Sequence, residues 1–348
     1  MMLDKKILVK ILLTVFLLTS TFSAKAAPAG GDEKFNPGTF ILDHIGDAYD
    51  WHVITWNGHH VSVPLPVILY SRQSGLNVFL SSKFDHGHSS YNGFSIVDGK
   101  IVEDATGVRP LLDLSITKNV FALFVSVAFI LWLFISLANI YTRRGNVAPK
   151  GMQSFVEPVL LFVRDEIARP AIGYKYKRFM PYLLTLFFFI LINNLMGLIP
   201  FFPFGANVTG NITVALVLAV LTFVVIMATS TTTYWGHIFN TPGVPWWLKF
   251  PLPLMPIIEL TGVITKPFVL MVRLFANITA GHIIVLGFFS LIFVFGEMSV
   301  ALGYGASVFS LLFSIFMFFL ELLVAFIQAY VFTLLSALYF GMAVQEHH

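Results

Sequence analysis

Cysteine is absent from the 348-residue chain, and charged residues make up only 11% of it. The lack of cysteine excludes disulfides, thiol catalysis and metal sites built on thiolates. No polybasic run with interleaved aromatic residues occurs, which argues against nucleic-acid binding. There is also no GxxxxGK[ST] loop and no Gly-x-Ser-x-Gly elbow. We therefore expect a chain that is not itself an enzyme and that holds no cofactor and no metal.

Apolar residues fill the sequence instead, at 57% of the chain and a mean hydropathy of +0.82. Soluble globular proteins carry about 25% charged residues, more than twice the fraction found here. The composition therefore indicates an all-α polytopic membrane protein. The net charge of +3 is small, so the placement of the charges carries more information than their sum.

The first 26 residues have the pattern of a secretory signal peptide. Three lysines, Lys5, Lys6 and Lys10, precede the short apolar run 11–18, and Ala24-Lys25-Ala26 offers a small-x-small cleavage site. The alternative is an uncleaved first membrane helix, but the apolar run is too short to span a bilayer. We predict a signal peptide over residues 1–26, which would deliver the following residues outside the cytoplasm.

Residues 27–115 are polar and predict a small β-rich extracytoplasmic domain. Alternating segments flank two turn dipeptides, Asn57-Gly58 and Asp98-Gly99, and both patterns are typical of hairpins with type I′ turns. Six of the ten histidines lie in this region. Those in His59-His60 and Asp85-His86-Gly87-His88 are possible metal ligands, but their spacing matches no closed tetrahedral site, which favours a solvated loop.

Five apolar blocks predict five membrane-spanning segments, in a membrane domain covering residues 116–348. They cover residues 119–141, 179–202, 212–234, 257–295 and 299–343. Eight basic residues lie in the loop 142–178, which predicts that this loop is cytoplasmic. The N-terminal domain is then outside and the C-terminus inside. Within the loop, residues 152–169 read as an amphipathic helix on the membrane surface, with apolar side chains concentrated on one side.

The last two blocks are too long to cross a membrane as straight, upright helices. At ~1.5 Å per residue, 35–45 residues exceed ~50 Å, whereas the hydrocarbon core is ~30 Å thick. Each helix must therefore tilt steeply or break. The glycines that offer breaks and turns are Gly281, Gly287, Gly296, Gly303 and Gly305.

The fourth block carries side chains that are costly inside a membrane. These are Glu259, Lys266, Arg273, Asn277 and His282. The first three are spaced seven apart, which places them on one helix face. Glu321 and Gln328 in the last block are also seven apart. A charge such as Arg273 at bilayer depth costs at least ~2.5–3.5 kcal/mol on insertion scales, and such residues usually mark ion pathways.

The two blocks run in opposite directions, so their polar residues can be compared in depth. His282 lies nine residues beyond Arg273, ~13 Å along the axis. If Gln328 is level with Arg273, Glu321 lies ~10 Å further out and close to the depth of His282. We predict a proton-exchanging His282–Glu321 pair. An outer polar track would run through His282, Glu321, Asn277 and Gln328, and an inner track through Glu259, with Arg273 between the two tracks.

Simpler interpretations remain open for several of these residues. Asn277 and Gln328, each taken alone, are typical of hydrogen-bonding between helices, and Lys266 is typical of a side chain that extends to the interface. Arg273 could form an internal ion pair with Glu321 or Glu259. We also interpret Asn193 and Asn194 as polar groups in helix packing.

The polar residues stand in runs that resemble subunit a of the F-type ATP synthase. The most specific run is Arg273-Leu274-Phe275-Ala276-Asn277 followed by Ala280-Gly281-His282. It is supported by Asn194-Leu195-Met196-Gly197-Leu198-Ile199-Pro200, Asn207-Val208-Thr209-Gly210-Asn211-Ile212-Thr213 and Gln328-Ala329-Tyr330-Val331-Phe332. The resemblance covers about residues 115–345, and leaves out the N-terminal region.

This resemblance implies a stator subunit that forms two proton half-channels against a rotor ring of c subunits. It implies that Arg273 faces the ring, that Asn277, His282, Glu321 and Gln328 serve the outer half-channel, and that Glu259 serves the inner one. It also implies b-type peripheral stalk subunits as partners and the bacterial inner membrane as location. The alternative is a stand-alone secondary ion transporter or channel, although the inverted repeat common in such proteins is not visible here.

Overall fold

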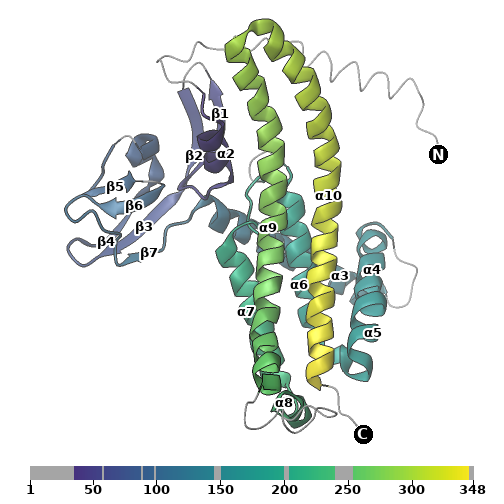
Figure 1. The fold of residues 1–348 in the computed structure, drawn as a ribbon. Coiled ribbons are helices and arrows are strands. Elements are labelled where there is room, and N and C mark those ends of the chain that lie inside the picture. Colours follow the sequence, from purple (N-terminus) through teal and green to yellow (C-terminus); the bar gives the residue numbers. More distant parts are fainter. Residues whose placement is uncertain are drawn as a thin grey trace. The chain divides into compact units, whose positions relative to one another are not determined.

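The structure is a computed structural model that describes residues 35–56, 59–87, 89–97, 99–144, 150–199, 204–239 and 254–344. The predicted signal peptide lies outside the described residues, as do Asn57, Gly58, His88 and Asp98. The described residues divide between two compact units, of which the larger contains residues 36–51 and the described residues from 63 onward. Figure 1 shows the order of the elements.

Five helical stretches in the described part of the chain are long and apolar enough to cross a membrane. They are α3 (Lys118–Arg144), the helical run 152–197, α7 (Ile212–Thr229), α9 (Leu254–Met298) and α10 (Val300–Val344). The number of spanning segments expected from the sequence is confirmed, and the chain is a polytopic helical membrane protein.

Two of the spanning helices end earlier than the sequence predicts. The second, α6 (Tyr176–Gly197), stops before residue 202, and Pro200 follows, which has no N–H to continue a helix. The third, α7, ends at Thr229 because Ser230 has an extended backbone, with φ −63° and ψ 137°. A separate helix, α8 (Thr232–Phe239), then begins, and Thr231 Oγ1 accepts a hydrogen bond from Tyr234 N at 3.3 Å.

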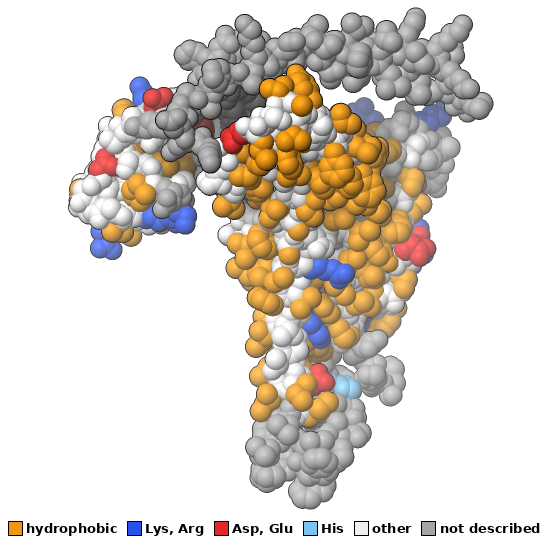
Figure 2. Space-filling view, turned by 45° about the horizontal axis from the view of Figure 1, so that its top comes forward, with side chains coloured by type: hydrophobic (Ala, Val, Ile, Leu, Met, Phe, Trp, Pro, Cys, Tyr) orange, Lys and Arg blue, Asp and Glu red, His pale blue; other side chains and the backbone are white. Residues whose placement is uncertain are grey.

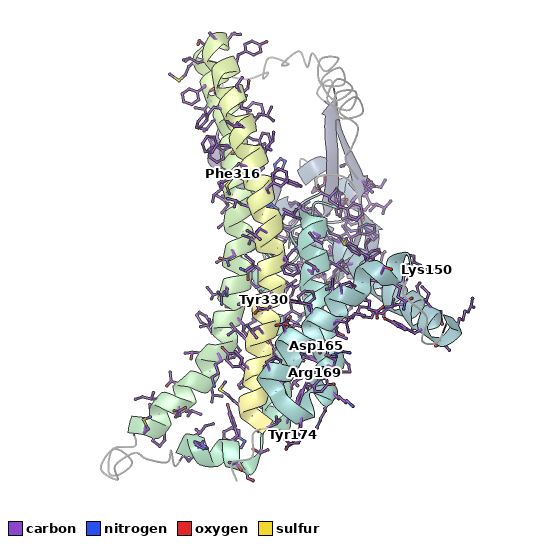
Figure 3. The ribbon with its side chains drawn as sticks, turned by 90° about the vertical axis from the view of Figure 1, so that its right-hand side faces the viewer. Lys150, Asp165, Arg169, Tyr174, Phe316 and Tyr330 are labelled. Atoms are coloured by element: carbon purple, nitrogen blue, oxygen red, sulfur yellow. The ribbon has the colours of Figure 1, made fainter. Side chains whose placement is uncertain are left out.

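The predicted amphipathic helix is a continuous helical run of several types. It comprises α4 (Met152–Phe162), the π-helical η2 (Val163–Ala168) and α5 (Arg169–Ile172), before the short η3 (Gly173–Lys175). Asp165 forms ion pairs with Arg164 and Arg169, at 2.8 and 2.7 Å (Figure 3). Val163 and Ile167 are fully buried. Protein therefore encloses this end of the helix, and its place on the membrane surface stays a prediction.

The last two helices are unbroken over 45 residues each. At ~1.5 Å per residue each is ~68 Å long. Of the two alternatives from the sequence, breakage is therefore excluded by the structure. The pair forms an antiparallel hairpin that turns at Ser299, where a Cβ added to Gly303 would lie 2.9 Å from the Gly296 Cα. Pro267 remains inside α9, and the bend of this helix in Figure 3 is of the kind a proline causes.

The membrane helices pack around a core that is rich in phenylalanine. Phe187 from α6 and Phe332 from α10 are buried in it, as is Leu274 from α9. The rings of Phe179 and Phe340 stack at 4.8 Å between centroids. This core fixes α6 against α9 and α10, the three helices that carry the polar residues discussed below.

The strands precede the membrane helices, after α2 (Pro37–Ile45). β1 (Asp50–Trp56) pairs with β2 (His59–Pro64), and β5 (Phe94–Val97) with β6 (Lys100–Glu103); these match the two expected hairpins. A three-stranded sheet in the order β4 (Gly75–Leu80), β3 (Pro66–Ser71), β7 (Leu112–Asp113) was not expected. The central strand, β3, is apolar at the consecutive positions Val67, Ile68 and Leu69, so the alternation that signals a half-buried strand is missing there.

Candidate functional site

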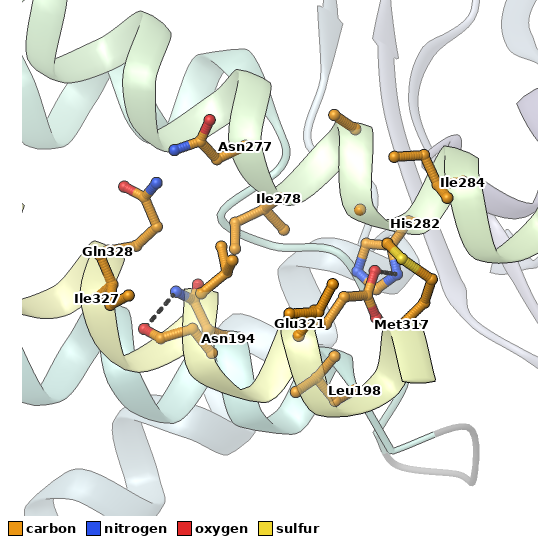
Figure 4. Close-up of a pocket in the computed structure, with 15 residues that line it drawn as sticks. Asn194, Leu198, Asn277, Ile278, His282, Ile284, Met317, Glu321, Ile327 and Gln328 are labelled. Carbon is orange, nitrogen blue, oxygen red and sulfur yellow. Dashed lines mark hydrogen bonds and ion pairs between the residues drawn. The ribbon is translucent and has the colours of Figure 1, made fainter. Parts of the chain in front are cut away.

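A pocket of about 350 Å³ lies where α6, α9 and α10 meet, and polar side chains from all three helices line it (Figure 4). Four of the six residues predicted from the sequence are among them: Asn277 and His282 from α9, and Glu321 and Gln328 from α10. The structure thus brings together every residue expected for the outer track. Asn194 from α6 adds a fifth polar group.

His282 and Glu321 face each other across the two long helices. Nδ1 of the histidine lies 3.9 Å from Oε1 of the glutamate, and their side chains are 22% and 12% exposed. Oε1 has no hydrogen-bond partner within the described part of the chain. The two groups therefore have the predicted proximity, and a modest side-chain rotation would bring them within hydrogen-bond range.

Gly281 explains how the glutamate fits beside α9. A Cβ added at this position would lie 2.6 Å from Glu321 Oε1. Gly197 of α6 is close to the loop that follows it, since its added Cβ would lie 3.3 Å from the Ala206 carbonyl oxygen, whereas 3.9 Å to His282 Nε2 is an ordinary van der Waals contact. The absence of a side chain at Gly281 makes room for the Glu321 carboxylate.

Asn194 lines the pocket and forms hydrogen bonds to two other segments of the chain. Its Nδ2 donates to the Ala325 carbonyl at 3.2 Å, and its Oδ1 accepts from Thr209 Oγ1 at 2.5 Å. Thr279 Oγ1 donates to the Gly210 carbonyl at 3.2 Å, which joins the same loop to α9. Asn194 therefore does pack helices, as interpreted from the sequence, but its place in the pocket was missed. Its only signal was an amide within an apolar span.

Arg273 stands outside this pocket, one helical turn before Asn277, and its side chain is exposed. Ion pairs between described residues do not include it, so the internal pair with Glu321 or Glu259 considered above is wrong. Its charge acts on the phenol of Tyr339. Val269 and Val272, close to it along α9, are exposed, and Figure 2 shows isolated basic groups among hydrophobic side chains on the face that it draws.

Glu259 belongs to a second polar group, nearer the N-terminus of α9. Its carboxylate interacts electrostatically with Lys266 and with Tyr234. Burial, followed by the charge of Glu259, raises the pKa of Tyr234. Lys266 Nζ lies 5.3 Å from the ring centroid of Tyr339, a cation–π contact. Tyr339 therefore has a cation–π contact with Lys266 and an electrostatic interaction with Arg273. The sequence did not predict this role.

The two polar groups lie on opposite sides of Arg273 along α9. His282 is nine residues to one side, and Glu259 is fourteen residues to the other, which corresponds to ~13 and ~21 Å along the axis. A permanent positive charge thus separates two sets of titratable side chains. In the described residues no group of three or more His, Cys, Asp or Glu is placed to hold a metal ion.

Fold and site together define a class: a polytopic membrane protein whose two long helices carry two separate polar groups, with an arginine between them that forms no ion pair with any described residue. Comparison with known proteins gives the family. Residues 120–341 match the family described as ATP synthase A chain, and the chain belongs to that family. Residues 40–118 match a second family, described as a domain of unknown function (DUF8433).

Relatives in this family are similar over much of the chain. An ATP synthase subunit a from Chloroherpeton thalassium is 42% identical over 244 residues, or 68% of this chain and 69% of the relative. An ATP synthase subunit a 2 from Chlorobaculum tepidum is 44% identical over 238 residues, or 66% and 64%. An ATP synthase subunit a from Anaeromyxobacter sp. is 35% identical over 344 residues, or 93% and 74%, so its similarity includes the N-terminal region.

Proposed function

We propose that this subunit conducts protons through two half-channels that meet a rotor of c subunits at Arg273. A proton would neutralise a carboxylate on the rotor, travel with it through nearly a full turn, and leave on the other side. A neutral carboxyl group can face lipid because it avoids most of the cost of desolvating a charge. Each proton that crosses a 100 mV potential supplies ~2.3 kcal/mol for rotation.

The outer half-channel would use the pocket between α6, α9 and α10. His282 and Glu321 can exchange a proton where they line this pocket, and the amides of Asn277 and Gln328, which also line it, offer donors and acceptors (Figure 4). Gln328 is almost completely buried, whereas Asn277 is exposed on α9. A proton passed along these groups would therefore emerge on the side of α9 that carries Arg273.

The inner half-channel would use Glu259. This carboxylate can accept a proton released from the rotor, and Tyr234 and Lys266 are close enough to act on it electrostatically. The Tyr234 phenol is protonated at neutral pH even with the ordinary tyrosine pKa of about 10, so it is a hydrogen-bond donor there.

Arg273 would hold the rotor carboxylate in its ionised form as it passes between the half-channels. Its guanidinium does not lose its proton under protein conditions, so it also blocks direct proton flow from one track to the other. The subunit itself makes and breaks no covalent bond to a substrate, so its part in ATP synthesis is non-catalytic. The steep tilt expected for α9 and α10 would lay both helices along the rotor.

The same proposal places the subunit in the bacterial inner membrane, beside b-type peripheral stalk subunits, with residues 27–115 outside the cytoplasm and the C-terminus inside. The observation that carries it is the exposed Arg273, which lies between two titratable groups on one helix and forms no ion pair within the described part of the chain. A static structural arginine would be expected to have a carboxylate partner within its own chain.

The test is Arg273→Ala in vesicles that contain the complete ATP synthase. We expect coupled ATP synthesis to be lost and a passive proton leak to be permitted, because the positive charge that separates the two half-channels is removed. Arg273→Lys should also largely fail, since a lysine enclosed between α9 and the rotor can lose its proton. Arg143→Ala, at the exposed end of α3, is the matched control. ATP-driven proton pumping by Arg273→Ala would refute the mechanism.

A further inference from the structure

One face of the sheet β4-β3-β7 is covered with exposed apolar side chains. Register places Tyr70 opposite both Leu76 and Leu112, and Ile68 opposite Val78. The exposed fractions are 44% for Tyr70, 66% for Leu76, 64% for Val78, 48% for Leu80, 51% for Leu112 and 65% for Leu114. We call these six side chains the apolar sheet face.

The opposite face of the sheet already has its own core. Val67 and Leu69 of β3 are fully buried there, together with Phe84. Asp113, which pairs with Leu69, points to this side and accepts a hydrogen bond from the Tyr49 hydroxyl at 2.6 Å. An antiparallel sheet with one buried face normally carries polar residues on the other. The apolar sheet face departs from that rule, and patches of this kind usually mark an interaction surface.

The sheet is joined directly to a membrane helix. Beyond β7, the N–H groups of Leu114 and Ile116 donate to the carbonyls of Ile68 and Pro66, both at 2.9 Å. Helix α3 begins two residues later, at Lys118, whose N–H donates to the Ala48 carbonyl at 2.8 Å. The N-terminal end of a spanning helix lies at the membrane interface, so the sheet is held at that interface by its own hydrogen bonds.

The residues around the apolar sheet face suit a lipid surface. Tyr70 is an amphipathic side chain of the kind enriched at the level of the headgroups. Exposed Arg72 lies in the turn between β3 and β4, two residues after Tyr70, and a cation at this place suits headgroup phosphates. None of the six side chains on the face is acidic.

We propose that the apolar sheet face rests on the lipid bilayer beside α3, with its leucine and valine side chains among the acyl chains nearest the headgroups. The occupant is a phospholipid surface that contains anionic headgroups. The three-stranded sheet would thus provide a membrane-contacting surface beside the first spanning helix. This assignment does not depend on the half-channels, because it concerns a different part of the chain.

The absence of cysteine makes the experiment direct, since Leu76→Cys and Val78→Cys each introduce a single thiol. The full-length variants are labelled with an environment-sensitive fluorophore and reconstituted into vesicles of phosphatidylethanolamine and phosphatidylglycerol. Val97→Cys, on the β5–β6 hairpin and 51% exposed, is the control. Two quenchers are compared: a phospholipid with a nitroxide near its headgroup, and iodide in the water.

We expect the nitroxide lipid to quench labels at positions 76 and 78 several-fold more strongly than the label at 97, with iodide showing the reverse order. Iodide quenching at 76 and 78 equal to that at 97 would overturn the proposal. So would protection from both quenchers, because protein would then cover the face. Leu114→Cys provides a third position on the same face if one variant fails to fold.

Discussion

Gly281 shows how much of the site depends on an absent side chain. The residue lies next to His282 on α9, and the space that a Cβ would occupy is filled by the carboxylate of Glu321. Glycine usually weakens a helix interior by about 0.5–1 kcal/mol relative to alanine. Its presence at this point is accounted for by the close approach of the glutamate.

Gly281→Ala should therefore displace the Glu321 carboxylate and slow proton transfer. A rise of about 1.4 kcal/mol in the barrier would lower the rate roughly tenfold. The measurement is the passive proton conductance of vesicles that contain the membrane sector. Gly287→Ala on the same helix is the control, since no described atom lies within 4 Å of its added Cβ. Equal conductance in the two variants would contradict the steric explanation.

The His282–Glu321 contact makes a second prediction at this scale. Exchanging the two residues, His282→Glu with Glu321→His, keeps two titratable groups in the same place. We expect the exchanged protein to retain proton pumping well above that of His282→Ala or Glu321→Ala, measured by ATP-driven acidification of vesicles. If the exchange is as damaging as either alanine variant, the two residues do not act as a pair.

At the scale of elements, α10 is held by a very close approach to α5. A Cβ added to Gly341 would collide with the backbone carbonyl oxygen of Ala171, so the two helices meet backbone to backbone. Small residues allow this close packing between membrane helices. Lys175 Nζ donates to the Val344 carbonyl at 3.3 Å and Thr231 N to the Ala343 carbonyl at 3.0 Å, which satisfies acceptors at the C-terminal end of α10.

Gly341→Ala should force α10 away from α5, because a carbonyl oxygen cannot rotate aside as a flexible side chain can. Overpacking of this kind costs roughly 1–3 kcal/mol. We expect a lower Tm in detergent micelles, followed by circular dichroism. Gly262→Ala on α9 should instead keep or raise the Tm, since its added Cβ meets no described atom within 4 Å. A Gly341→Ala protein as stable as Gly262→Ala would disprove the close contact.

At the scale of the whole molecule, Arg273 identifies the surface that meets the rotor. Val269 lies one turn before it on the same face of α9 and is 49% exposed. We expect Val269→Cys to form a disulfide with a cysteine placed beside the carboxylate of a c subunit, on oxidation of assembled membranes. Trp132→Cys, exposed on α3, should not. Cross-linking from position 132 but not from 269 would place the rotor on another face.

Much of the fold was predictable because apolar length is a local property of the chain. The five spanning segments and the two β-hairpins followed from runs of residues and from turn dipeptides. The predictions were wrong where a contact between residues far apart in the sequence sets the local structure. The third span ends at Thr229 because Thr231 bonds to α8 and to Ala343, far along the chain. The sheet β4-β3-β7 was missed because its central strand, β3, is apolar on both faces.

The sequence by itself determined which side chains share a helix face, since positions seven apart in one helix lie together in any environment. It also determined that Arg273 carries a permanent charge between Glu259 and His282. Only the tertiary structure decided that His282 meets Glu321 beside Gly281, that Asn194 joins their pocket, and that Arg273 has no partner in the described chain. These depend on how separate helices cross, and packing between residues far apart in the sequence sets that geometry.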